Sequence, residues 1–164
     1  MDIYRLSERV MAMDDAAWAR HAHPFSVYSR FAVLPLLALA IWSRVWLGIW
    51  ALGPVLLVLV FTFLNPRLCP PVEGPPAGWA GKGTAGERLW LARRERPVPA
   101  RHVVPCHMLS GVAVLGLVVC AVALWRLDAG LLLAGLALAM GGKAWFVDRM
   151  VWLYEDMRGA ARDG

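Results

Sequence analysis

Four long apolar stretches, arranged as two pairs, dominate the pattern of hydrophobic and polar positions along the chain. They cover residues 25–43, 46–64, 103–125 and 129–147. Each approaches the length of about 20 residues that a helix needs to cross a bilayer. The connection within each pair is only a few residues long, which is typical of antiparallel neighbours. The pattern therefore predicts an all-α integral membrane protein with four transmembrane helices in two antiparallel hairpins.

The segments between these stretches divide the chain into parts. We interpret residues 1–164 as a single membrane domain with an interfacial helix (1–24), a helical hairpin (25–64), a cytoplasmic basic loop (65–102) and a second hairpin (103–157). In the first part, Ile3, Leu6, Val10 and Met13 recur at helical spacing. Such spacing, with charges on the other positions, is typical of an amphipathic helix lying on a membrane.

The basic loop contains a short glycine motif. Residues 81–86 formally match GxGxxG, but no strand precedes them, so we interpret them as a flexible linker. Thr84 and Glu87 match a capping box, in which a hydroxyl and a carboxylate satisfy free N–H groups at the start of a helix. We therefore predict a short helix over residues 85–95, lying on the membrane surface.

The distribution of basic residues predicts the orientation. Of the 17 Lys and Arg residues, only Arg44 and Arg126 fall in the two short turns. An even number of crossings places residues 1–24, the loop and the C-terminal tail on one side, together with the remaining basic residues. Cytoplasmic segments carry an excess of Lys and Arg. We therefore predict a multi-pass protein of the cell (plasma or inner) membrane, with the N- and C-termini in the cytoplasm.

The composition supports a membrane protein. Hydrophobic residues make up 59% of the chain, against roughly 45–50% in soluble domains. The net charge of +5 fits the lipid bilayer and its anionic lipids as partners. No nucleic-acid motif is present, and the three Cys residues lack the spacing of a disulfide framework. A homo-oligomer or a partner membrane protein is the alternative partner, and no particular cofactor is indicated.

Histidines and carboxylates near the predicted cytoplasmic ends of the helices could hold iron, zinc or copper. The candidate metal ligands are His21, His102, His107 and Asp148. His21 and His23 precede a proline, which favours an extended backbone in which both imidazoles face one way. The competing interpretation is that these histidines bond backbone carbonyls or lipid phosphates, because no HExxH-type motif supports the metal site.

A second set of polar residues is the candidate site for a lipid head group or another ligand: His21, Asn65, Arg149, Trp152 and Glu155. Lys143 is the deepest charge in the fourth stretch, and ionisable groups inside a membrane indicate function. Alternatively, its side chain extends to the interface and pairs locally. We expect one cavity open to the cytoplasm, surrounded by residues of both sets: His21, Asp148 or Arg149, and one of His102 and His107.

Small residues recur along one stripe of the third stretch and one stripe of the fourth. They are Ala113, Gly116, Cys120 and Ala123 in the third, and Gly135, Ala139 and Gly142 in the fourth. Small side chains let helix backbones approach closely in lipid. We therefore predict that these two helices pack along these stripes.

Five segments indicate a family: Arg5–Met11, His21–Arg30, Asn65–Leu68, Gly86–Trp90 and Lys143–Met157. They resemble small prokaryotic integral membrane proteins that share domain of unknown function 6653. The resemblance covers nearly the whole chain, and its last segment is the most specific. It implies a prokaryotic plasma membrane and no particular reaction.

Three functions compete at this point. The leading hypothesis is a protein that binds a lipid, a small hydrophobic ligand or a partner helix at the cytoplasmic interface. The alternative is a metal- or haem-dependent membrane enzyme that uses the His and Asp ligands. The weaker alternative is a small transporter or channel subunit, with Lys143 and Asp148 controlling passage.

The predicted topology can be tested with reporters on the intact chain. A reporter fused after Gly164 should read cytoplasmic, and a tag inserted at Asp128 should be accessible from outside the cell. An external reading at Gly164, or a protected tag at Asp128, contradicts the four-helix orientation.

Overall fold

The computed structural model describes residues 15–160, and every regular element in this part of the chain is helical. In chain order the elements are α2 (Asp15–His21), α3 (Pro24–Trp42), α4 (Arg44–Leu47), the 3-10 helix η1 (Gly48–Ala51), α5 (Leu52–Leu64), the 3-10 helix η2 (Asn65–Leu68), α6 (Gly78–Leu91), α7 (Ala100–Arg126) and α8 (Ala129–Ala160). The predicted all-α class is confirmed. Most of the predicted interfacial helix over 1–24 lies outside the described residues, and α2 is its last part.

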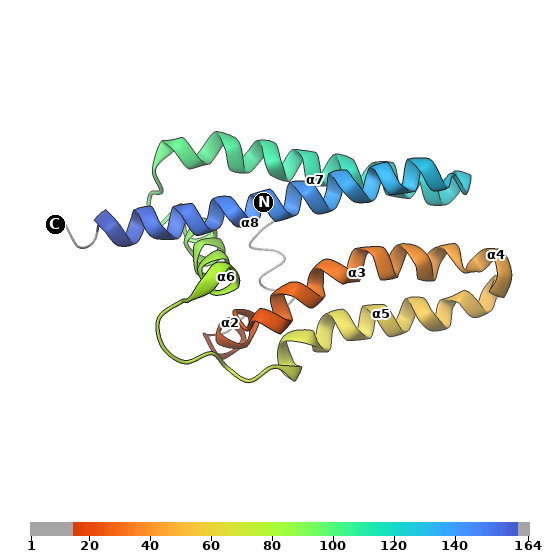
Figure 1. The fold of residues 1–164 in the computed structure, drawn as a ribbon, viewed down its shortest axis with the longest axis horizontal. Coiled ribbons are helices and arrows are strands. Elements are labelled where there is room, and N and C mark those ends of the chain that lie inside the picture. Colours follow the sequence, from red (N-terminus) through yellow and green to blue (C-terminus); the bar gives the residue numbers. More distant parts are fainter. Residues whose placement is uncertain (1–14, 161–164) are drawn as a thin grey trace.

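Two long helical pairs form the body of the molecule. Helices α7 and α8 lie side by side, and α3 lies beside α5, with α4 joining them at the far end (Figure 1). Three helical stretches in the described part of the chain are long and apolar enough to cross a membrane: 24–68, 100–126 and 129–160. The first of these includes α3 to η2 and folds back on itself at α4.

The helix boundaries differ from the prediction in two places. The second apolar stretch is divided, because η1 precedes α5 and leaves that helix only 13 residues. Gly48 has a φ of 55°, a left-handed conformation that interrupts the helix between α4 and η1. In contrast, α8 continues well beyond the predicted end of the apolar stretch, to Ala160.

The contact between α7 and α8 is built from small residues. A Cβ atom placed on Gly116 would lie 2.3 Å from the backbone nitrogen of Ala139, and one on Gly135 would lie 2.8 Å from the nitrogen of Cys120. Gly142 approaches the backbone of Ala113 in the same way. The predicted packing along two small stripes is therefore confirmed.

Helix α6 corrects the prediction for the basic loop. Residues 81–86 are not a linker, because the helix begins at Gly78 and includes them. Thr84 lies in the middle of this helix, so it is not a capping residue. The glycines make α6 a packing element: a Cβ on Gly86 would lie 1.9 Å from the carbonyl oxygen of Met150 in α8. With Trp90 only 1% exposed, one face of α6 packs in the helical core.

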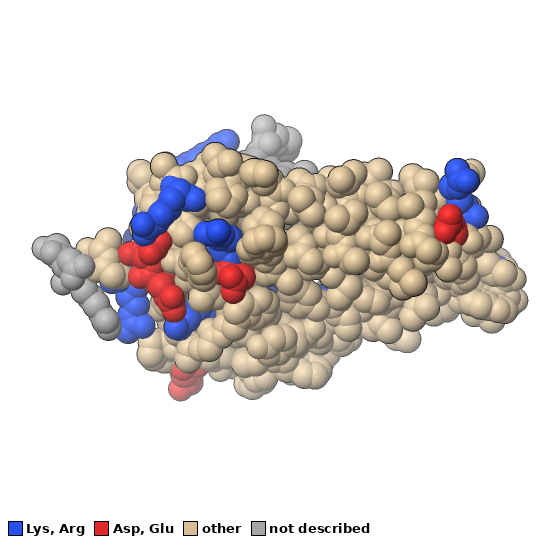
Figure 2. Space-filling view, turned by 45° about the horizontal axis from the view of Figure 1, so that its top comes forward, with Lys and Arg blue, Asp and Glu red and all other residues tan. Residues whose placement is uncertain are grey.

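Charged side chains gather at the two ends of the molecule on the face that Figure 2 shows, and the band between them carries almost none. We call the end with the smaller group the turn end, because α4 and the turn between α7 and α8 lie there (Figure 1); the charged residues of these turns are Arg44, Arg126 and Asp128. There Arg44 donates a hydrogen bond to the carbonyl oxygen of Leu124, which joins the α3–α5 pair to α7. The opposite end, which we call the polar end, includes α6 and the last turns of α8.

Replacing Gly135 with Leu should separate α7 from α8, because no side chain fits between Gly135 and Cys120. Overpacking of this kind costs about 1–3 kcal/mol. For a chain of this size, that is a fall in melting temperature of about 3–10 °C. Thermal unfolding of the detergent-purified protein measures it.

The matched control is Gly141→Leu in the same helix, where a Cβ atom meets nothing within 4 Å. This variant should keep the wild-type melting temperature or raise it, because Leu favours a helix more than Gly does. An equal fall in both variants would show that helix packing is not the cause.

Candidate functional site: a charged cavity between α3, α6 and α8

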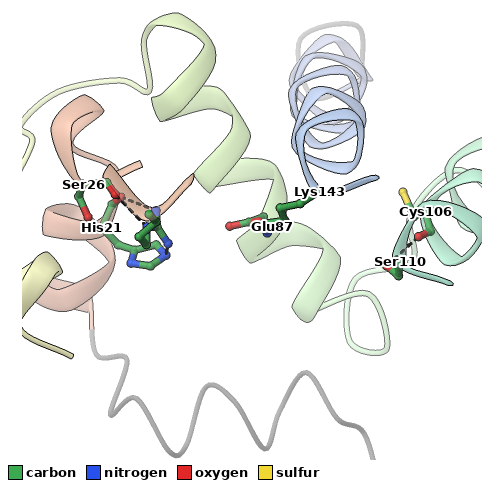
Figure 3. A network of polar contacts seen from close by, with 7 residues as sticks. His21, Ser26, Glu87, Cys106, Ser110 and Lys143 are labelled. Atoms are coloured by element: carbon green, nitrogen blue, oxygen red, sulfur yellow. Dashed lines mark hydrogen bonds and ion pairs between the residues drawn. The ribbon is translucent and has the colours of Figure 1, made fainter. Parts of the chain in front are cut away.

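An ion pair joins α6 to α8 at the polar end. Lys143 Nζ lies 2.5 Å from Glu87 Oε1, and the Glu87 side chain is only 17% exposed. Figure 3 shows the two side chains pointing toward one another from the two helices. Glu87 follows Gly86 directly, so the close backbone contact at Gly86 brings the carboxylate to α8. Lys143 therefore pairs with a residue far away in the sequence and not locally.

Arg30 of α3 is held beside this ion pair by backbone and side-chain acceptors. Its Nε donates to the carbonyl oxygen of Ser26 at 3.0 Å, and Nη2 donates to the carbonyl oxygen of His21 at 3.3 Å. Nη1 also contacts His21 Nε2. A guanidinium only donates hydrogen bonds, so His21 Nε2 must be the acceptor and the imidazole is neutral. The neutral imidazole then carries its proton on Nδ1, which is buried without a partner.

The three charged groups line one cavity of about 100 Å³. Its walls are Val27, Arg30, Phe31, Thr84, Glu87, Lys143 and Val147. Val27, Phe31 and Val147 are apolar, and the remaining lining residues supply two cations, one carboxylate and a hydroxyl. The space exceeds that of a single water molecule several times over. A small polar group attached to an apolar chain fits these polar and apolar walls.

Burial and neighbouring charges shift two titrating groups here. Desolvation by burial and the positive charge of Arg30 lower the pKa of His21 from the usual 6.5 to about 3, in agreement with the neutral imidazole. Burial by itself would raise the pKa of Glu87, but the ion pair with Lys143 and the charge of Arg30 hold it below its usual value. At neutral pH the cavity therefore contains Arg30 and Lys143 as cations and Glu87 as an anion.

The predicted metal ligands each have a different neighbour. His21 contacts Arg30, His102 lies 2.6 Å from Asp156, and His107 packs its ring on Trp90. Asp148 accepts a hydrogen bond of 3.3 Å from Trp79 Nε1. Among residues 15–160, no three His, Cys, Asp or Glu side chains form a group that could hold a metal ion.

His23 does not face the same way as His21. The chain is extended at His23 only, where the imidazole caps α3 by accepting a hydrogen bond from the backbone N–H of Phe25. His21 ends α2 and faces Arg30. The extended His-x-His arrangement expected from the following proline is therefore wrong, because a helix end separates the two residues.

The predicted head-group residues are also dispersed. Asn65 is fully buried and joins Ser26 to Ser29 through its amide. The Arg149 guanidinium lies over the ring of Trp152, and Glu155 pairs with Lys82 at 2.6 Å.

Of the predicted residues, Lys143 lines the charged cavity and His21 adjoins it through its contact with Arg30. The charged cavity has other members than the cavity expected around His21, Asp148 or Arg149, and His102 or His107. The residues lie at one end of the bundle, but they point to different neighbours.

Arg30 and Glu87 are the site residues that the sequence did not reveal. In the sequence, Arg30 lies near the start of the first apolar stretch, and Glu87 matches the second position of a capping box. A signal was nevertheless present, because Arg30 and Lys143 are two cations inside apolar stretches and cations in such places require a counter-ion. Glu87 is the acidic residue within the small, glycine-rich helix α6.

The fold and the cavity define an all-α protein with membrane-type apolar helices and a charged, partly apolar cavity near one end. The chain belongs to a family of unknown function, DUF6653, whose sequence profile matches residues 4–163. This match confirms the family that the sequence segments indicated. No curated protein and no solved structure matches the chain.

The neutral state of His21 makes stability depend on pH. The unfolded chain binds a proton at His21 near pH 6.5, and the folded protein does so only near pH 3. The contribution of neutral His21 to the free energy of unfolding is therefore complete well above pH 6.5, and it declines as the pH falls toward 3. Between pH 6.5 and about 5 the loss should be about 1–2 kcal/mol. His21→Gln keeps an acceptor for Arg30 and should lose less stability in this interval. The measurement is the free energy of unfolding of both proteins between pH 5 and 6.5. An equal fall in the two proteins would contradict a neutral, buried His21.

The ion pair can be tested by removing its partners singly and together. Lys143→Met leaves the Glu87 carboxylate without its partner, which should cost about 1–3 kcal/mol. The double variant Lys143→Met with Glu87→Gln should recover most of this loss, because neither member of the ion pair is then left without the other. Thermal unfolding in detergent measures all three proteins.

Lys82→Met is the control for the ion-pair experiment. Lys82 belongs to α6, like Glu87, and its partner Glu155 is 52% exposed against 17% for Glu87, whereas Lys82 and Lys143 are 32% and 52% exposed. Exposed pairs contribute little, so the loss should stay below about 1 kcal/mol. An equal loss of stability in Lys82→Met and Lys143→Met would mean that the Lys143–Glu87 pair contributes no more than an exposed ion pair.

Proposed function

We propose that this protein crosses the membrane four times and binds the anionic head group of a lipid or another amphiphile in the charged cavity. One observation supports this function above others: Arg30 and Lys143 share a cavity with the apolar walls of Val27, Phe31 and Val147. Cations that are partly removed from water bind anions well, and an apolar wall beside them favours a ligand with a hydrocarbon chain.

The depth of the cavity favours an amphiphile over a water-soluble ligand. From Asp128 at the turn end to Lys143, α8 rises about 22 Å at 1.5 Å per residue. The hydrocarbon core of a bilayer is about 30 Å thick. With the turn end at one surface, the cavity lies within the opposite leaflet, close to its head groups. An amphiphile already in the bilayer reaches this level without leaving the membrane.

The outer surface of the helices supports the four crossings. No residue of α5 is buried, and its leucines face outward. Trp46, Trp50 and Trp125 at the turn end are 71%, 81% and 86% exposed. Trp side chains are enriched where the bilayer meets water. Together with the bands of charge at both ends, this surface matches a bilayer that covers the molecule between them.

The orientation follows from the basic residues. The polar end contains most of the Lys and Arg side chains, and the turn end contains Arg44 and Arg126. By the positive-inside rule, the polar end faces the cytoplasm. The cavity then lies in the inner leaflet of the cell membrane, which is rich in anionic lipids.

Ligand-induced stabilisation tests the proposed function. Lysophosphatidylglycerol should raise the melting temperature of the purified full-length protein above that in lysophosphatidylcholine of the same acyl chain. At a ligand concentration of about 100 times Kd, stabilisation is about 2.7 kcal/mol. This corresponds to about 5–10 °C for a chain of this size. Arg30→Gln and Lys143→Gln should each remove most of the difference.

Two arginines at other positions serve as controls. Arg126→Gln at the turn end and Arg158→Gln near the end of α8 change the net charge equally but leave the cavity intact. Both should keep the lipid-dependent shift. If all four variants lose it, the lipid binds the basic surface in general and not the cavity. If wild-type protein shows no shift with the anionic lipid, the proposed function is wrong.

A further inference from the structure

The cavity has a net charge of one positive unit. Arg30 and Lys143 contribute two positive charges, and Glu87 contributes one negative charge. His21 adds none, because its Nε2 accepts from Arg30. These are the charged and titrating groups that act on Glu87 from α2, α3 and α8. The other walls of the cavity, Val27, Phe31, Thr84 and Val147, carry no charge.

The three charged groups differ in whether they contact a group of opposite charge. Glu87 and Lys143 pair with one another at 2.5 Å, so each neutralises the other. The partners of Arg30 are the carbonyl oxygens of Ser26 and His21 and the neutral imidazole. None of these three partners of Arg30 is a carboxylate. The uncompensated positive charge of the cavity is therefore at Arg30.

We propose that the cavity selects a monoanionic head group, such as a phosphodiester or a carboxylate, over a dianionic phosphomonoester, and that Glu87 determines this selection. The inference rests on the proposed function, because it specifies the charge of the ligand bound there. One negative charge on the ligand makes the occupied cavity neutral. A second negative charge would remain uncompensated beside Glu87.

The partly buried position of these charges makes the difference in binding free energy between a monoanion and a dianion large. Charges interact about four times more strongly at an effective dielectric constant near 20 than in bulk water. An uncompensated charge that is removed from water is strongly unfavourable. Glu87 is only 17% exposed and lines the cavity together with the apolar Val147 of α8, so little water screens its repulsion of a second negative charge.

The test compares lysolipids that share one acyl chain but differ in head-group charge. Lysophosphatidylglycerol is a phosphodiester with one charge, and lysophosphatidic acid at pH 8 is a phosphomonoester with nearly two. The corresponding fatty acid supplies a carboxylate, which distinguishes the two sources of a monoanion. Wild-type protein should bind the phosphodiester or the carboxylate at least about tenfold more tightly than the phosphomonoester.

Two variants separate charge selection from folding. Glu87→Gln gives the cavity two positive charges and should reverse the preference toward lysophosphatidic acid. Glu87→Gln combined with Lys143→Gln returns the net charge to one and should restore the preference for a monoanion. Binding is measured on the helical, monodisperse fraction of each protein. If the single variant is unstable because Lys143 has lost its partner, the double variant removes that cause and still tests the charge selection.

The outcomes distinguish this inference from the function on which it rests. If wild-type protein binds anionic lysolipids at the cavity but prefers the phosphomonoester, the charge selection is wrong and the proposed function stands. If the preference for a monoanion persists unchanged in Glu87→Gln, Glu87 does not determine it. If no anionic lysolipid binds better than lysophosphatidylcholine, both proposals are wrong.

Discussion

The close contact between the backbones of α6 and α8 is the constraint on which the charged cavity depends. At Gly86 the two helices approach so closely that a single methyl group would overlap the carbonyl of Met150. The next residue, Glu87, is thereby fixed against Lys143. Without this contact, Lys143 would have no acidic partner from α6. Its ammonium group would then have to be solvated by water or paired with a lipid head group.

The polar end contains a second group of charges with a different role. His102 and Arg101 at the start of α7 both bind Asp156 near the end of α8. Asp156 accepts from both residues, and His102 is only 1% exposed, with its Nδ1 buried without a hydrogen-bond partner. The group joins the ends of two helices and encloses no cavity among those described. Arg30, Glu87 and Lys143 differ because they line an open space.

The two helical pairs contribute unequally to the structure. Helices α7 and α8 pack backbone against backbone and form a firm support, to which α6 adds a third layer. The α3–α5 pair contacts this support through Arg44 at the turn end, through a buried cluster of Ala38 with residues of α7 and α8, and through Arg30 near the polar end. The cavity therefore lies where the looser pair meets the firmer one. Such a seam between two packed units can admit a ligand while the core remains intact.

The sequence by itself determined the helices, the packing stripes and the family, because apolar stretches, small residues at helical spacing and specific segments are local properties. Tertiary structure decided the role of α6 and the members of the site. The glycines of residues 81–86 have low helix propensity and indicate a linker, but their missing side chains allow the contact with α8 that stabilises the helix. The sequence also placed His21, His102 and Asp148 at one level of the bundle. Which of them meet depends on the rotation of each helix about its axis and on the crossing of α6. Those quantities follow from packing, and they brought Arg30, Glu87 and Lys143 together instead.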